Sequence, residues 1–149
     1  MPLFTVNRVA TALSVSADLL TIVASGTKPL RILMAKLAGA GTASAANEVV
    51  MQRSSGGTTP GGAIVPAKVN TGSAAASFSA YTTWAGGQPS LTADTVLHRF
   101  SVNANGGIDP FVALPGGEIS VPVSGQVSFR SVAGTSNAII NLMIEEVDG

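Results

Sequence analysis

Residues 138–146 read AIINLMIEE, and this stretch decides the fold class. Ile140, Leu142 and Ile144 stand two positions apart, and the side chains of an extended chain alternate between its two faces. The three branched side chains therefore share one face of the segment. This period of two is typical of a half-buried β-strand.

The same period recurs along the whole chain, with glycine-rich turns between the runs. We expect strands at residues 4–9, 18–24, 30–37, 48–53, 63–68, 77–83, 96–103, 111–114, 119–123, 127–132 and 138–146. Because 17 Gly and 8 Pro interrupt the sequence, almost no long helix fits between them. One alternative stays open: residues 11–20 can form a helical turn capped by Ser16 or Asp18. The pattern predicts an all-β chain, an antiparallel β-sandwich that forms a single domain over residues 1–149 with Gly-rich loops.

The chain carries little charge for its size. Charged residues make up 11% of its 149 residues, against roughly 25% in an ordinary soluble domain. Between residues 54 and 93 the only charged side chain is Lys68. Interface cores show the same depletion, so we expect sister subunits of a homo-oligomer to cover much of this surface. The alternative is a loop surface that Ser, Thr and backbone groups alone keep soluble.

The charge balance and the hydrophobic pattern narrow the range of partners. Eight basic and eight acidic residues give a net charge of zero, which argues against nucleic acid and against a polybasic membrane contact. No apolar stretch is long enough to span a membrane, and residues 1–10 lack the basic and apolar regions of a signal peptide. We therefore expect synthesis and assembly in a cytoplasm.

The sequence offers few groups for catalysis or for metal binding. His98 is the only histidine, and it falls inside the expected strand 96–103, in phase with Val96 and Phe100, where we expect a packed structural role. With no cysteine and with thinly spread carboxylates, no zinc or calcium site is expected. We predict a non-enzyme with no catalytic residue, no cofactor and no metal. A hydrolase that uses His98 or a pair of distant carboxylates is the least favoured hypothesis.

Two expected strands are apolar on both faces, which a two-layer sandwich does not require. Residues 30–37 are apolar apart from Arg31 and Lys36, and residues 138–144 are apolar apart from Asn141. Because a sandwich buries one face of each sheet, a second apolar face predicts a further contact. We predict an oligomer interface in the low-charge region 54–93 and at four side chains: Tyr81, Trp84, Ile139 and Met143.

Several short sequence runs along most of the chain follow one another in the same order as in one known protein family. They are FTV at 4–6, LTIV at 20–23, KPLRIL at 28–33, the small-residue loop GTASA at 41–45, EVVMQR at 48–53, PAKV at 66–69, LHRF at 97–100 and the strand 139–146 that ends in Glu-Glu. In this succession of strand and turn the chain resembles the jelly-roll head-decoration proteins, or cement proteins, of tailed bacteriophages. It departs from them after the turn at Gly106 and Gly107, where its aromatic residues are reduced to Phe111 and Phe129.

The resemblance implies a jelly-roll subunit that forms a trimer and binds over the lattice of the major capsid protein. It also implies a location on the outer capsid surface of the virion and synthesis in the host cytoplasm. A subunit that binds only the assembled lattice adds its binding free energy to that lattice, and symmetric copies multiply the effect. The alternative is a jelly-roll carbohydrate-binding module or fibre-head adhesion module, which predicts exposed aromatic residues or clustered carboxylates in one cleft.

Overall fold

The computed structural model describes residues 1–148. All of the regular secondary structure within these residues is β-strand. The strands are β1 (Leu3–Ala12), β2 (Asp18–Val23), β3 (Leu30–Gly39), β4 (Ala46–Ser55), β5 (Thr58–Gly61), β6 (Ala67–Lys68), β7 (Ser79–Tyr81), β8 (Thr83–Gly87), β9 (Ser90–Asn103), β10 (Ile108–Val112), β11 (Ile119–Val121), β12 (Gln126–Ala133) and β13 (Asn137–Glu146). The predicted all-β fold class is confirmed.

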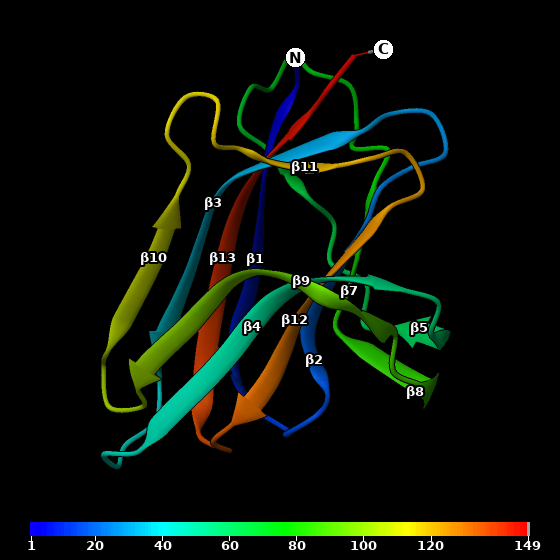
Figure 1. Ribbon diagram of the computed structural model, residues 1–149. Helices are drawn as coiled ribbons and strands as arrows, with labels where there is room; N and C mark the ends of the chain where they lie inside the picture. The colour runs from blue at the N-terminus through cyan, green and yellow to red at the C-terminus, as the bar shows by residue number, and fades with distance from the viewer. Residues whose placement is uncertain (149) are drawn as a thin grey trace.

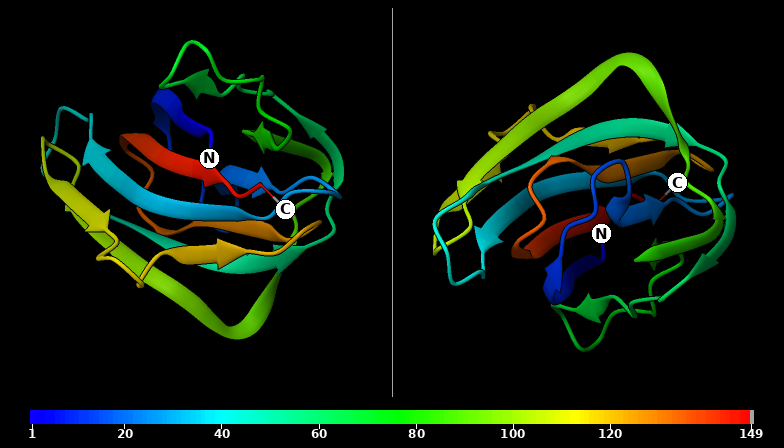
Figure 2. Two further views of the ribbon diagram at one scale, coloured as in Figure 1. Left: turned by 90° about the horizontal axis from the view of Figure 1, so that it is seen from above. Right: turned by 90° about the horizontal axis from the view of Figure 1, so that it is seen from below.

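Two antiparallel sheets form the two layers of a sandwich (Figure 1). The first, named sheet A here, has the strand order β10-β3-β13-β1-β6, and β11 pairs with the beginning of β3. The second, sheet B, has the order β7-β2-β12-β4-β9. The short strands β5 and β8 pair with each other in a separate two-stranded sheet. The views from above and from below in Figure 2 show the two layers, and the antiparallel pairing within each sheet confirms the predicted sandwich.

The long strands alternate between the sheets in the order of a jelly roll. Strands β1, β3, β10 and β13 belong to sheet A, and β2, β4, β9 and β12 belong to sheet B. The chain therefore changes sheet at each step between these strands except from β4 to β9. The resulting orders β10-β3-β13-β1 and β2-β12-β4-β9 are those of two interlocked Greek keys. This topology places the first and last strands side by side in sheet A (Figure 1).

The hydrophobic core lies between the sheets, and the period of two in the sequence builds it. In β13, Leu142 is fully buried whereas its neighbour Met143 is partly exposed. The register of β1 and β13 aligns Phe4 with Ile144 and Val6 with Leu142, so these four side chains share the inner face. From sheet B, the largest buried side chains are Leu20, Ile22, Met51, Phe100 and Phe129.

The segment 11–20 forms no helical turn, so that alternative is wrong. Strand β1 continues to Ala12, and a turn at residues 15–16 leads directly into β2 at Asp18. Ser16 adopts a φ of 67° in this turn, and its N–H donates to the carbonyl oxygen of Ser131. The chain can therefore pass from sheet A to sheet B within a few residues.

Proline and a change of direction shorten two of the expected strands. The strand expected at 63–68 is reduced to β6 and one isolated bridge between Ile64 and Ala80, because Pro66 has no N–H to donate to a ladder. The strand expected at 77–83 divides at Thr82 into β7 and β8, which pair with different neighbours. Strand β5 was not expected, since Pro and Gly occupy its second half.

Candidate functional site

The outer face of sheet A carries two apolar rows that cross three strands. The pairing register aligns Ile108, Ala38 and Ile139 in the first row, and Val112, Met34 and Met143 in the second. Ile108 and Val112, both on the edge strand β10, are 64% and 65% exposed. These six residues are called the sheet A patch below. Their inward-facing neighbours fill the core, so the patch lies on the opposite side of the same strands.

The surroundings of the sheet A patch are close to electrically neutral. Lys36 and Asn141 lie opposite each other between the two rows, and Pro110 flanks Lys36 on β10. Beyond the second row, Arg31 Nη1 lies 3.4 Å from Glu145 Oε2, so these two charges compensate each other. Among residues 1–148 Lys36 forms no ion pair and is the only uncompensated charge within the rows. Such a face suits an apolar partner surface.

The four predicted interface residues fall into two groups on different layers. Ile139 and Met143 lie in the sheet A patch, whereas Tyr81 lies on β7 at the edge of sheet B and Trp84 lies on β8 of the separate two-stranded sheet. Trp84 is only 9% exposed, and its Nε1–H donates to Thr21 Oγ1 at 2.9 Å. The rest of the chain therefore covers the Trp84 ring and pairs its indole N–H, which leaves little of this side chain accessible to a partner. Tyr81 is half-buried and packs edge-on against Trp84, with ring centroids 5.7 Å apart.

A buried carboxylate organises the outer face of sheet B. Asp18 accepts hydrogen bonds from Arg130 Nε at 2.5 Å, from Ser128 Oγ at 2.5 Å and from Thr21 Oγ1 at 2.6 Å. Its side chain is fully buried, and that of Arg130 is 12% exposed. Arg130 Nη2 also donates to the carbonyl oxygen of Pro89. This network fixes the segment between β8 and β9 over the face of sheet B, which is why polar residues are buried there.

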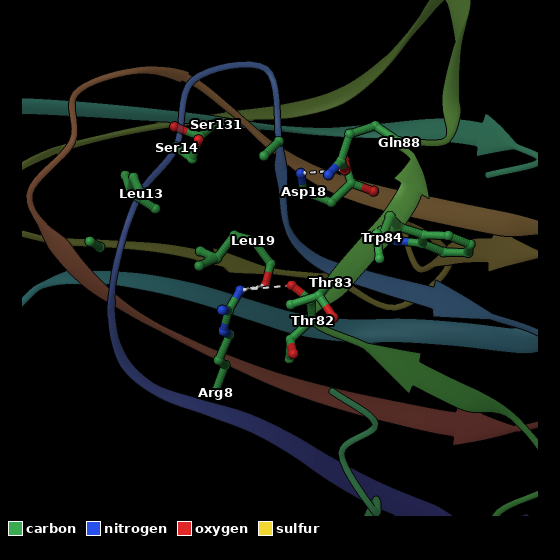
Figure 3. A pocket seen from close by; sticks show the side chains of 13 residues that line it. Arg8, Leu13, Ser14, Asp18, Leu19, Thr82, Thr83, Trp84, Gln88 and Ser131 are labelled. Atoms are coloured by element: carbon green, nitrogen blue, oxygen red, sulfur yellow. Dashed lines mark hydrogen bonds between the residues drawn. The ribbon is translucent and has the colours of Figure 1, made fainter. Parts of the chain in front are cut away.

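A cavity of about 280 Å³ opens beside this network, between the end of β1, the beginning of β2 and the β8 segment (Figure 3). Arg8 reaches into it, where its Nη1 donates to the carbonyl oxygens of Leu19 and, at 3.4 Å, of Thr82. Its Nη2 donates to Thr11 Oγ1 at 3.4 Å. Partial burial lowers the pKa of Arg8, although a guanidinium keeps its charge at neutral pH. The sequence gives no signal for Arg8, because the cavity joins segments that lie far apart in the chain.

His98 packs at the edge where β9 of sheet B meets β10 of sheet A. Its ring centroid lies 4.5 Å from that of Phe100 and 5.5 Å from that of Phe111. Its Nε2 lies 3.7 Å from Asp109 Oδ1, and within residues 1–148 this buried nitrogen has no hydrogen-bond partner. The Asp109 carboxylate accepts a hydrogen bond from the N–H of Ser101 at 2.9 Å. His98 is thus placed for packing among aromatic rings.

Neither a cluster of metal ligands among the described residues nor a similar known protein points to a function for this chain. Within residues 1–148, no three His, Cys, Asp or Glu side chains lie close enough together to hold a metal ion. The same residues contain no helix long and apolar enough to cross a membrane. Comparisons of the chain with protein-family models, with curated proteins and with solved structures found no match. Function is therefore inferred from the geometry of the sheet A patch and of the cavity.

Proposed function

We propose that this protein is a structural decoration (cement) subunit of a tailed-phage head. In this proposal a homo-oligomer, a trimer, binds over the lattice of the major capsid protein on the outer surface of the virion and stabilises the shell. The sheet A patch is the observation that carries the proposal of assembly. The resemblance to jelly-roll decoration proteins supports the capsid as the partner. The proposal includes no catalytic activity.

The sheet A patch supports assembly because its apolar side chains gain free energy when a neighbour covers them. Burial of apolar surface contributes about 25 cal/mol per Å², and soluble monomers rarely leave a large contiguous apolar patch uncovered. Ile108 and Val112 are mostly exposed in the isolated subunit. A sister copy is the favoured occupant, since a chain with zero net charge and a nearly neutral patch is not repelled by its own copies.

Stabilisation of a shell needs only modest contacts in each subunit. A ligand that binds the assembled lattice and not its free parts shifts the equilibrium toward assembly. A trimer that contacts three lattice positions at once gains from a high effective concentration after the first contact. Low charge on the subunit also limits long-range repulsion between neighbouring trimers on a crowded shell.

Co-sedimentation with purified tailed-phage capsids that have been stripped of their decoration subunits tests this function. The wild-type chain is expected to sediment with the capsids and to reach a saturating copy number. Met143→Lys places a charge in the sheet A patch, breaks the trimer and lowers the apparent capsid affinity at least tenfold through lost multivalency. Val123→Lys changes a valine that is 47% exposed in the loop after β11, and it serves as the matched control. A wild-type chain that stays in the supernatant would contradict the proposal.

A second candidate function, carbohydrate binding by an adhesion or fibre-head module, is favoured by one observation, the cavity beside Arg8. That hypothesis predicts exposed aromatic residues, whereas Trp84 is 9% exposed. The capsid role therefore stays the first proposal, and the two roles are compatible within one subunit because the sheet A patch and the cavity involve different residues.

A further inference from the structure

The cavity beside Arg8 has the size and the mixed lining of a small-molecule site. Its volume of about 280 Å³ lies just below the range of roughly 300–1,000 Å³ that is typical of ligand pockets. It therefore suits one ring-sized molecule and not an extended chain. The apolar part of its lining comes from Leu13, Leu19 and Trp84, and the polar part includes Ser14, Thr82, Thr83 and Gln88 (Figure 3).

Arg8 brings an uncompensated positive charge to this cavity. A guanidinium has five N–H donors, and the three hydrogen bonds of Arg8 use three of them. The other two have no acceptor within residues 1–148, and no ion pair of these residues includes Arg8. Asp18 also lines the cavity, but its carboxylate is already bound by Arg130, Ser128 and Thr21. The cavity thus lacks an anion for its cation.

Two further polar groups in the lining retain hydrogen-bonding capacity. Ser131 is 1% exposed, and its Oγ has no hydrogen-bond partner within residues 1–148. Gln88 uses its Oε1 to accept the N–H of Asp18 at 2.9 Å, which leaves its side-chain NH₂ group available as a donor. Buried polar groups are normally paired, so an unpaired hydroxyl in a cavity wall points to a bound molecule or an ordered water.

We infer that this cavity binds a monosaccharide-sized sugar acid, for which glucuronate is the simplest probe. The carboxylate pairs with the two remaining donors of Arg8, a geometry that a guanidinium fork favours. The ring hydroxyls exchange hydrogen bonds with the Ser, Thr and Gln side chains, while the carbon face of the ring packs against Leu13 and Leu19. The same chemistry is offered by a free sugar acid and by an acidic unit of a glycan. The inference uses no part of the sheet A patch.

Titration calorimetry of the full-length chain tests this inference with four probes: glucuronate, glucose, inorganic phosphate and an oligosaccharide that ends in glucuronate. We expect saturable binding of glucuronate, with glucose and phosphate bound at least tenfold more weakly because each lacks one part of the recognised chemistry. Binding of the oligosaccharide as well identifies a glycan as the source, and binding of glucuronate alone identifies a free sugar acid; both support the inference. Absence of saturable glucuronate binding, or equal affinity for glucose or phosphate, would overturn it.

Variants of the lining residues make the test specific to the cavity. Arg8→Gln is expected to lower glucuronate affinity at least tenfold, whereas Arg99→Gln, at an exposed arginine on β9, leaves it unchanged. Because Arg8 also holds two backbone carbonyls, Ala85→Trp provides a second variant that fills the cavity from an exposed lining position. It is expected to abolish binding without lowering the melting temperature. Unchanged affinity in either folded variant contradicts the site, and neither result bears on capsid binding.

Discussion

At the scale of single residues, Asp18 is the group on which the polar network of sheet B depends. Asp18→Ala removes the partner of the Arg130 guanidinium, whose side chain is only 12% exposed. Loss of one partner from a buried ion pair costs about 3–5 kcal/mol, since the remaining charge stays buried without compensation. We expect that decrease in the free energy of unfolding, measured by urea denaturation.

The exposed pair of Glu48 and Arg99 is the matched control for this prediction. Their side chains are 36% and 62% exposed, and the ion pair between them is 3.1 Å long. Exposed ion pairs contribute about 0–1 kcal/mol, so Glu48→Ala is expected to change the free energy of unfolding little. If Asp18→Ala and Glu48→Ala cost the same, the network does not have the role given to it here.

Gly134 and Gly106 have nearly the same φ angle but different surroundings. Substituting each of them by alanine therefore distinguishes the cost of backbone strain from the cost of steric contact. The φ angle is 88° at Gly134 and 90° at Gly106. A Cβ atom on Gly134 would lie 2.3 Å from Asn47 Oδ1 and 2.5 Å from the carbonyl oxygen of Ala46, whereas one on Gly106 would meet nothing within 4 Å. Gly106→Ala is expected to cost about 1–2 kcal/mol of strain, and Gly134→Ala clearly more. Equal melting temperatures of the two variants would refute this account of the turn at Gly134.

The sequence predicted which face of a strand a residue occupies only where the register of strand pairing is regular. His98 and Phe100 lie on one face of β9 as predicted, with packed rings. Val96 was expected on the same face but is 42% exposed, and Leu97 instead packs against the core. The cause is an irregularity in the register opposite Met51, which shifts the phase of the strand. The amino-acid composition of β9 does not predict such a bulge.

At the scale of elements, the two faces of β13 lie in different environments. Leu142 is fully buried and Met143, the next residue, lies in the sheet A patch. Leu142→Ala is expected to lower the free energy of unfolding by about 2–5 kcal/mol because it leaves a cavity in the core. Met143→Ala is expected to cost far less in the isolated subunit. Chemical denaturation of both variants at low protein concentration makes the comparison, and a larger loss for Met143→Ala would reverse the assigned faces.

The long strands could be predicted because each carries its own periodic pattern, whereas the short ones depend on distant partners. The apolar patterns at 30–37 and 138–146 correctly predicted β3 and β13, which the structure pairs in sheet A. Strand β10, which completes the sheet A patch, was expected at 111–114 and lies at Ile108–Val112. The cavity could not be predicted at all, since Arg8 acquires its surroundings only when β1, β2 and β8 come together.

At the scale of the whole molecule, the jelly-roll topology gives the chain two outer sheet faces of different character. The segment that carries Trp84 covers the outer side of sheet B at β2 and β12, where it contacts Thr21 and Arg130. Sheet A leaves its outer side open, with two apolar rows and one uncompensated lysine among the described residues. The low-charge region 54–93 forms β5 to β8 and lies outside the sheet A patch.

The solution mass of the intact chain, measured by light scattering over a range of concentrations, tests assembly through the sheet A patch most directly. We expect three chain masses for the wild type and for the control Val123→Lys, and a single chain mass for Met143→Lys with an unchanged circular dichroism spectrum. A wild-type chain that keeps the mass of one subunit at every concentration would contradict the account.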